Sequence, residues 1–230
     1  MSVIVICSGG LDSVNLAWKV ANEDSLELLL SFDYGQRHRK ELDFAKKCAR
    51  PLGVPHRVID LIDVGRALSG SALTDDIDVS DGHYAQENMK ITIVPNHNAI
   101  MLAIAFGVAG ACGADTVAAT VHGGDHFIYP DRRSDFIESF SKMQEFALDG
   151  VADSSINTPF VNWGKSDIVT GGNRFSVRFE YTRSCYKGGE THYERCGTRV
   201  ERREAFGLAE LEEPTIYEGR NYWRSATKVD

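Results

Sequence analysis

The hydrophobic pattern in the first part of the chain alternates between short apolar runs and stretches with helical spacing. Residues 2–7 form an apolar run rich in β-branched side chains, which is typical of a buried parallel strand. In residues 11–22 the apolar positions recur at the spacing of one helix face. The alternation continues, and it predicts strands at 26–32 and 57–61 and a helix at 40–50 that ends before Pro51. This order predicts an α/β fold with a doubly wound parallel sheet.

The pattern is less regular in the rest of the chain. The polar residues 65–90 indicate a long loop over one end of the sheet. Further on, the pattern predicts helices at 99–111, 135–149, 165–169 and 200–209, and strands at 115–120 and near residue 158. Asn98 can cap the first of these helices and Gly113 can end it. We therefore expect a core at residues 1–180 and a small C-terminal lobe at residues 181–230.

Composition and charge narrow the class of protein. The chain has 230 residues, 43% of them hydrophobic, so it can bury a substantial core. Its formal net charge of −8 argues against general nucleic-acid binding, and we interpret the basic run 195–203 as a solvated helix face. The odd number of cysteines, 5, indicates a reducing, cytoplasmic compartment rather than a disulfide framework. No window approaches the apolar run of a transmembrane helix, so we expect no membrane partner.

The sharpest motif is Ser-Gly-Gly-Leu-Asp-Ser at residues 8–13, directly after the first predicted strand. Its glycines let backbone N–H groups approach an anion closely, and the following helix points its positive end at that anion. Ser8 and Ser13 add hydroxyl donors, and Asp12 can hold a Mg²⁺ ion that bridges phosphate oxygens. The motif lacks the Gly-Lys-Ser/Thr of a Walker loop and the third glycine of a dinucleotide fingerprint. An ordinary capped turn is the alternative, but the full hexapeptide favours a phosphate site.

This hexapeptide resembles the pyrophosphate loop, or PP-loop, of the N-type ATP pyrophosphatases. The resemblance implies a Rossmann-like core of the adenine nucleotide alpha hydrolase type, which cleaves ATP between its α and β phosphates and forms an adenylate. The loop residues implied to bind ATP are Ser8, Gly9, Gly10, Leu11, Asp12 and Ser13.

Further segments narrow the resemblance to one family. They are FDYGQRHRKEL (32–42), GSALTDD (70–76), VPNHNAIML (94–102), GDHFIYPD (124–131) and SCYKGG (184–189). In this order they resemble the 7-cyano-7-deazaguanine synthase, or QueC, family over nearly the whole chain. The resemblance implies an ATP-dependent carbon–nitrogen ligase of queuosine biosynthesis. It converts 7-carboxy-7-deazaguanine and ammonia into 7-cyano-7-deazaguanine through an adenylate and an amide, and it acts as a homodimer.

The resemblance also implies roles for individual residues. It makes Asp12 and Lys165 the catalytic residues. The implied nucleotide-binding residues outside the loop are Asp33, Gln36, Arg37, Asn96 and Asn98, and the implied deazaguanine-binding residues are Asp125, Tyr129 and Asp131. A capped turn at Asp33, a helix cap at Asn98 and a solvated Lys165 are open alternatives. His122 and His126 have a metal-like spacing, but they lie in a predicted loop, so we interpret them as pocket or packing residues.

A zinc clip of four cysteines near the C-terminus is a further feature implied by the family, with the spacing C-x7-C-x2-C-x2-C. In this chain the four positions carry Cys185, Tyr193, Cys196 and Arg199, and His192 is an adjacent alternative ligand. Tyrosine and arginine cannot replace thiolates at neutral pH, and Arg199 would place a cation beside a dication. Zinc is therefore expected for the family but doubtful in this chain. A variant that stops at the amide and a catalytically impaired nucleotide-binding homologue stay open beside the main function.

Overall fold

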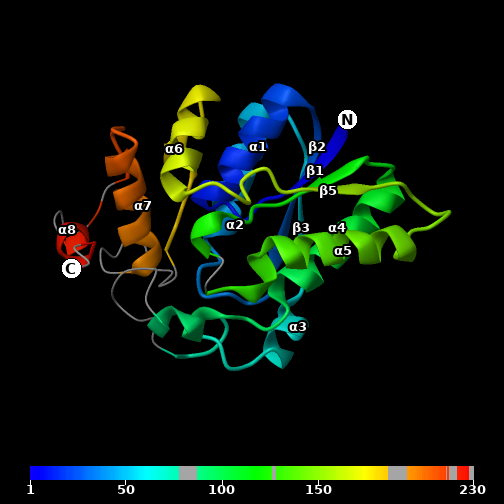
Figure 1. Ribbon diagram of the computed structural model, residues 1–230, viewed down its shortest axis with the longest axis horizontal. Helices are drawn as coiled ribbons and strands as arrows, with labels where there is room; N and C mark the ends of the chain where they lie inside the picture. The colour runs from blue at the N-terminus through cyan, green and yellow to red at the C-terminus, as the bar shows by residue number, and fades with distance from the viewer. Residues whose placement is uncertain (78–86, 126–127, 186–195, 216, 218–221, 228–230) are drawn as a thin grey trace.

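The computed structural model describes residues 1–77, 87–125, 128–185, 196–215, 217 and 222–227. A parallel sheet lies at the centre of the molecule, with strand order β3-β2-β1-β4-β5 (Figure 1). Its strands are β1 Ser2–Ile6, β2 Ser25–Asp33, β3 His56–Asp60, β4 Thr116–Ala118 and β5 Ser155–Asn157. The predicted α/β fold with a doubly wound parallel sheet is confirmed.

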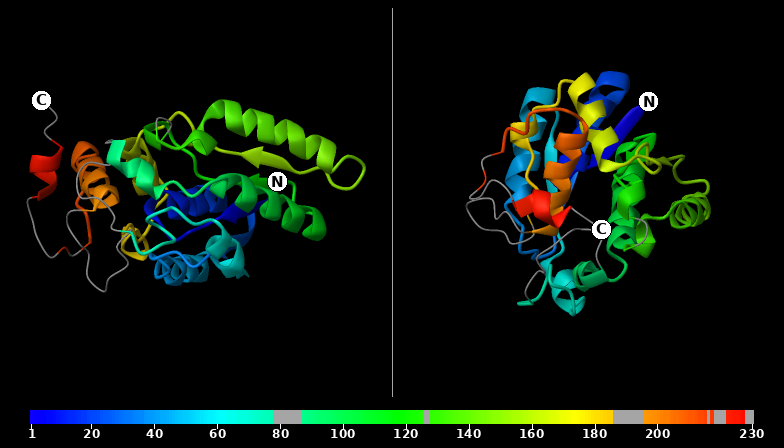
Figure 2. Two further views of the ribbon diagram at one scale, coloured as in Figure 1. Left: turned by 90° about the horizontal axis from the view of Figure 1, so that it is seen from below. Right: turned by 60° about the vertical axis from the view of Figure 1, so that its left-hand side comes forward.

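Helices cover both faces of this sheet. They are α1 Leu11–Glu23, α2 Glu41–Leu52, α3 Ile62–Ala67, α4 His97–Cys112, α5 Ser134–Ala147, α6 Lys165–Arg174, α7 Gly197–Leu208 and α8 Tyr222–Ala226. Short 3-10 helices span Glu87–Thr92, Gly123–Asp125, Pro130–Arg132 and Phe179–Tyr181. Helices α1, α2, α6 and α7 share one hydrophobic cluster, and α4 and α5 share the other. Figure 2 shows α7 and α8 side by side at one end of the molecule.

Strand β1 explains how the two clusters meet. Val3 and Val5 belong to the cluster with α1 and α2, whereas Ile4 belongs to the cluster with α4 and α5. Successive side chains of a strand point to opposite faces, so a strand covered on both sides is apolar at nearly every position. This central position places the residues that follow β1 in the middle of the sheet edge.

Several predicted boundaries differ from the structure; α6, for example, extends to Arg174 rather than ending at residue 169. Helix α2 continues through Pro51 and ends at Gly53, which has a left-handed φ of 69°. The interval 65–90, predicted to be a loop, contains the end of α3 and the start of a 3-10 helix. Asn96, with a φ of 56°, rather than Asn98, is the residue before the first turn of α4. Gly113 ends α4 in a left-handed conformation, as predicted.

One helical stretch, Met89–Cys112, is long and apolar enough to cross a membrane by length and composition, with a mean hydropathy of 1.5. The expectation that no window approaches this character is therefore wrong. Within this stretch, Leu102, Ala105 and Phe106 are buried in the cluster that α4 forms with the sheet. Core helices of soluble proteins meet the same criterion, so this stretch is weak evidence for a membrane span.

The prediction that the basic run 195–203 forms a solvated helix face is also wrong at two positions. Arg199 and Arg202, on α7, are both 0% exposed. Helix α7 packs on α6, and its Ala205 and Phe206 belong to the same cluster as β1 and α1. The proposed division of the chain at residue 180 stays a prediction, but α7 contributes directly to the core on this face of the sheet.

The buried Arg202 gives a test of how this helix is held. Its Nε lies 2.7 Å from Glu213 Oε1, and its Nη1 donates to Thr182 Oγ1 at 2.6 Å. Removing one partner of a buried ion pair leaves the other charge uncompensated. We expect Glu213→Ala to lower the free energy of unfolding by about 3 kcal/mol. The neighbouring Glu212 is exposed and serves as the control. Glu212→Ala should change the free energy of unfolding by less than about 0.5 kcal/mol. Equal urea midpoints for the two variants would contradict this role.

Candidate functional site

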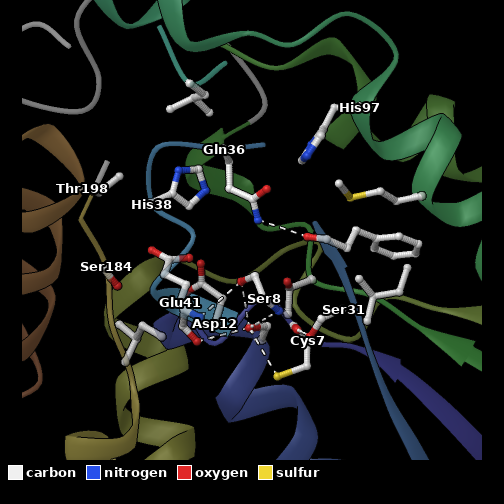
Figure 3. Close-up of a pocket in the computed structure, with 18 of the residues that line it drawn as sticks. Cys7, Ser8, Asp12, Ser31, Gln36, His38, Glu41, His97, Ser184 and Thr198 are labelled. Carbon is white, nitrogen blue, oxygen red and sulfur yellow. Dashed lines mark hydrogen bonds between the residues drawn. The ribbon is translucent and has the colours of Figure 1, made fainter. Parts of the chain in front are cut away.

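A polar pocket lies at the carboxyl ends of the central strands. In a sheet of this strand order, the connections after β1 and β4 leave in different directions and open a crevice between them. The pocket in Figure 3 lies there. Its walls come from the ends of β1 and β2 and from the first turns of α1, α2, α4 and α6. The segments after β4 and before α5 also contribute. Ser184 and the start of α7 add two C-terminal segments. The predicted phosphate loop thus faces a cavity built from widely separated parts of the chain.

The loop between β1 and α1 presents hydroxyl and backbone groups to the pocket. Ser8 Oγ and Ser13 Oγ lie 3.1 Å apart, and Ser13 Oγ also accepts a hydrogen bond from Ser8 N at 3.2 Å. Gly10 N donates to Ser8 Oγ at 3.2 Å, which keeps the turn tight. In the described part of the chain, no side chain caps the N-terminus of α1 at Gly10. The positive end of α1 is thus aimed at the pocket, an arrangement that suits an anion.

Gly9 is the position in this loop that only glycine can occupy. Its φ is +89°, which side chains rarely adopt. A Cβ at Gly9 would lie 1.9 Å from the carbonyl oxygen of Glu41 and 2.7 Å from Ala45 N. On its other side, Gly9 O accepts a hydrogen bond from Arg183 N at 2.9 Å. The loop is therefore held between α2 and the segment before the predicted zinc clip.

The floor of the pocket carries a cluster of charged groups centred on Lys165. Lys165 Nζ lies 2.7 Å from Asp12 Oδ2 and 3.3 Å from Glu201 Oε2. His122 Nε2 lies 3.3 Å from the same ammonium and 3.7 Å from Asp12 Oδ2. These elements converge because α6 packs against both α1 and α7. The structure thus brings together the two predicted catalytic residues, Asp12 and Lys165.

The opposite end of the pocket is aromatic, and the Arg132 guanidinium lies beside it. Figure 3 shows Gln36, His38 and His97 on the far side of the cavity from Ser8 and Asp12. The Tyr34 ring makes edge-to-face contacts with both histidines, with centroid distances of 6.4 Å to His38 and 5.0 Å to His97. Gln36 is fixed because its Oε1 accepts from Tyr34 N at 2.9 Å and its Nε2 donates to Phe32 O at 3.1 Å. This end suits a flat, neutral ring better than a phosphate.

Both pocket histidines are neutral at physiological pH. Burial, together with the nearby His97, lowers the pKa of His38 to about 3. Burial and the Arg132 guanidinium lower the pKa of His97 to about 3 as well. Neutral imidazoles can donate or accept a hydrogen bond without adding charge to this end of the pocket.

These depressed pKa values predict a pH-dependent stability. The unfolded chain binds a proton at His38 below about pH 6.5, whereas the folded chain does so only near pH 3. The free energy of unfolding should therefore fall as the pH drops through this window, by up to about 1.4 kcal/mol per pH unit for His38. We expect His38→Gln to flatten this decline in urea titrations between pH 6.5 and pH 4. Parallel pH profiles for the two proteins would contradict the neutral, buried state of His38.

Glu41 connects the pocket with the C-terminal cysteines. Its side chain lines the pocket, and its Oε1 accepts a hydrogen bond from Cys185 N at 3.4 Å. Burial raises the pKa of Glu41 to about 8, although the Cys185 amide and the guanidinium groups of Arg183 and Arg199 act in the opposite direction. The segment around Cys185 therefore forms the back of the pocket wall.

Several predicted nucleotide-binding residues support the site without lining this pocket. In the described part of the chain, its lining does not include Asp33, Arg37, Asn96 or Asn98. Asp33 caps the turn at Gly35 and pairs with Arg39 at 2.6 Å, as its structural alternative proposed. Arg37 Nη1 donates to Ile77 O at 2.5 Å and braces the polar loop. Their direct contact with nucleotide stays a prediction.

Of the three predicted deazaguanine-binding residues, Tyr129 and Asp131 lie near the aromatic end of the pocket, next to Arg132 and α4. Asp131 accepts from Asn98 N at 3.0 Å, and its own carbonyl oxygen accepts from Asn98 Nδ2 at 3.2 Å, so its carboxylate caps α4. The Tyr129 hydroxyl bonds Thr92 Oγ1 at 2.6 Å and is buried. Asp125 ends the 3-10 helix after β4, whereas His126 lies outside the described residues. None of the three lines the pocket as far as the structure describes it.

Sequence reasoning missed several residues of the pocket wall, among them Glu41, Thr198 and Glu201. Glu41 begins α2, and the other two lie on the first turns of α7. An acidic residue at a helix start carries no signal that separates a site residue from an ordinary charge near the helix dipole. Only tertiary packing brings these helix ends to the pocket.

The residues at the predicted zinc clip do not fit a zinc ion. Cys185 and Cys196 are both buried, but Tyr193 and His192 lie outside the described residues. Arg199 occupies the fourth position, and its buried guanidinium has no lone pair to offer a metal. Across the described residues, no group of three or more His, Cys, Asp or Glu side chains could hold a metal ion.

Comparison with known proteins decides the family. The family model described as Queuosine biosynthesis protein QueC matches residues 2–210. The chain belongs to this family. A 7-cyano-7-deazaguanine synthase from Rhizobium meliloti (strain 1021) is 65% identical over 227 residues, covering 99% of this chain and 96% of the relative. One from Brucella anthropi is 63% identical over 226 residues, covering 98% and 97%.

The QueC assignment confirms the resemblance seen in the motifs. Among solved structures, a 4-thiouridine synthetase–RNA complex with bound ATP matches with 14% identity and a TM-score of 0.43, over 90% of this chain and 53% of that chain. That similarity is too weak to carry an argument. The QueC assignment therefore depends on the family model and on the full-length relatives.

Proposed function

We propose that the chain makes 7-cyano-7-deazaguanine from 7-carboxy-7-deazaguanine and ammonia with the consumption of ATP. The observation that carries this proposal is identity of 62 to 65% to 7-cyano-7-deazaguanine synthases over essentially the full length of the chain. The intact loop at residues 8–13, which faces the pocket, supports the use of ATP.

Activation of the carboxylate explains the need for ATP. A carboxylate oxygen is a poor leaving group, so ammonia cannot displace it directly. In our proposal the carboxylate attacks the α-phosphorus, pyrophosphate leaves, and ammonia then displaces AMP to give the amide. A second ATP activates the amide oxygen in the same way, and loss of AMP and a proton gives the nitrile. The protein's main task is to position the reactants and stabilise charge.

The phosphate end of the pocket supplies this stabilisation. Backbone N–H groups at the start of α1 and the hydroxyls of Ser8 and Ser13 are placed to hold the departing pyrophosphate. The Lys165 ammonium, now 2.7 Å from Asp12, adds a positive charge beside the same loop. One carboxylate together with substrate phosphates is a common Mg²⁺ site, so Asp12 would hold the ion that shields the phosphate charge.

The aromatic end of the pocket is proposed to hold the deazaguanine ring. Tyr34, His38 and His97 offer ring faces and neutral nitrogens, which suit a flat heterocycle. Asp125 remains our proposed acceptor for the guanine-like N1–H and 2-amino groups. Asp131 and Tyr129 would support this end indirectly. Asp131 accepts a hydrogen bond from α4, and Tyr129 bonds the 3-10 helix before α4.

The decisive experiment incubates the protein with 7-carboxy-7-deazaguanine, ammonium, ATP and Mg²⁺ and identifies the products by mass spectrometry. Nitrile together with AMP supports the proposal, accumulated amide identifies a variant that stops halfway, and absence of AMP identifies an impaired homologue. Asp12→Ala should abolish AMP release. Persistent release by this variant would overturn the role given to the loop.

We further propose that the chain acts as a homodimer in the cytoplasm. Similarity to the family and the low, odd cysteine count support these two points. Light scattering measures the molar mass of the purified protein. A homodimer should give twice the chain mass of 25.4 kDa. A single species of the monomer mass would contradict it.

A further inference from the structure

The predicted zinc positions form a buried cluster around an arginine. We call Cys185, Cys196, Arg199 and Glu41 the cysteine–arginine cluster. The two cysteines and the arginine are each 0% exposed, and Glu41 is 7% exposed. Arg199 is among the largest fully buried side chains in the described residues.

Two separate segments meet at this cluster. Cys196 is the residue before the first turn of α7, and its carbonyl oxygen accepts from Arg199 N at 2.8 Å and from Val200 N at 3.1 Å. Cys185 follows the segment that bonds Gly9 through Arg183, and its amide donates to Glu41 Oε1. Arg199 therefore lies where the helix start and the Cys185 segment come together.

The Arg199 guanidinium has Cys185 and Tyr217 as neighbours, and within the described residues none of its nitrogens makes a hydrogen bond. Burial lowers the pKa of Arg199, whereas the neighbouring Cys185 and Tyr217 act to raise it. Its Cζ also lies 5.4 Å from the centre of the Tyr217 ring, within the range of a cation–π contact. A buried guanidinium is tolerated only when such partners offset its loss of water.

We propose that Arg199 takes the place of the metal ion in this cluster, so that its buried guanidinium, and not zinc, joins the Cys185 segment to α7. A zinc clip holds two chain segments together through a central cation bound by thiolates. Here the central cation is covalently part of α7, lies over the Tyr217 ring, and is close enough to Cys185 and Glu41 to shift the pKa values of this cluster. A dication would be repelled by this guanidinium and would lack the ligands to displace it. The proposal does not depend on the enzymatic activity.

The first test measures metal content and chelator sensitivity of the full-length protein. Purified in the presence of zinc and then dialysed without it, the protein should hold less than about 0.1 zinc per chain by mass spectrometry of the metals, because a structural site is essentially fully loaded. Treatment with EDTA should leave its melting temperature unchanged. One zinc per chain, or a chelator-dependent loss of stability, would overturn the proposal.

The second test turns Arg199 back into a ligand. Arg199→Cys places a third thiol beside Cys185 and Cys196, so added zinc should bind stoichiometrically and raise the melting temperature of this variant. Arg203→Cys is the matched control, because it adds a thiol one turn further along α7, at a partly exposed position where Arg203 stacks on Tyr217 at 4.5 Å. Zinc should stabilise neither this control nor the wild type. Absence of zinc binding by Arg199→Cys, with circular dichroism showing that it is folded, would contradict the position given to Arg199.

Discussion

Replacing Lys165 with alanine should lower kcat/KM for nitrile formation by about 100- to 1,000-fold, the usual effect of removing one charge-stabilising donor from an active site. The physical reason lies in its two partners. Lys165 Nζ lies 2.7 Å from Asp12 and 3.3 Å from Glu201, so its removal leaves two carboxylates facing the incoming phosphates. The negative charge at the floor of the pocket then increases where the reaction also releases negative charge. AMP release under single-turnover conditions measures this effect directly.

Two comparison variants make this prediction specific to the site. Lys142→Ala removes an exposed lysine on α5 that pairs with Glu145 and lies over the Phe146 ring, and it should leave kcat/KM unchanged. Lys165→Arg keeps the charge but replaces a compact ammonium by a larger planar group, so it should recover only part of the activity. An alanine variant as active as the wild type would show that Lys165 merely neutralises Asp12 and Glu201.

Gly9→Ala should abolish nucleotide binding, with at least a 100-fold loss of affinity for ATP. The added methyl group would lie 1.9 Å from the Glu41 carbonyl oxygen, a backbone atom that cannot rotate away. The residue must also abandon its φ of +89°, and either change moves the N–H groups that follow in the loop. Strain and overpacking together should lower the free energy of unfolding by about 2 to 5 kcal/mol. Isothermal titration with a nonhydrolysable ATP analogue and urea unfolding measure the two effects.

Gly53→Ala is the control that separates backbone strain at a positive φ from the steric clash of the added methyl group. Gly53 also has a left-handed φ, 69°, but a Cβ there would meet no atom within 4 Å. It ends α2 on the side of the molecule away from the loop, so its replacement should cost about 1 kcal/mol of stability and leave ATP affinity unchanged. Similar losses of affinity in both variants would show that global stability, and not the shape of the loop, limits binding.

The sheet could be predicted from sequence because its strands are buried on both faces. Runs such as residues 2–7 have no competing interpretation when a glycine-rich turn and an amphipathic stretch follow. The errors lie where tertiary contacts outweigh local preference. Helix α2 includes Pro51 because it falls in the last turn, next to the left-handed Gly53. The arginines at 199 and 202 look like a solvated face, yet both are buried, and Glu213 and Thr182 pair with Arg202 inside the protein.

The candidate site was predictable only where residues are contiguous. The loop at residues 8–13 carries its own geometry, so its hydroxyls and glycines could be assigned from sequence. Lys165 came from the family resemblance, and its contact with Asp12 over 153 positions depends on α6 packing against α1. Glu41 and Glu201 could not be recognised, because only the meeting of α2 and α7 gives these acidic side chains a pocket to line.

The hydrogen bond from Arg183 N to Gly9 O has a consequence for synthesis of the chain on the ribosome. A nascent chain that has emerged only as far as β5 carries every strand of the sheet and the whole phosphate loop. It still lacks the segment that holds Gly9 from behind and the α7 residues Thr198 and Glu201 that close the wall. During synthesis the proposed ATP site can therefore be completed only after the C-terminal segments have emerged, so nucleotide affinity should report whether the far end of the chain has docked.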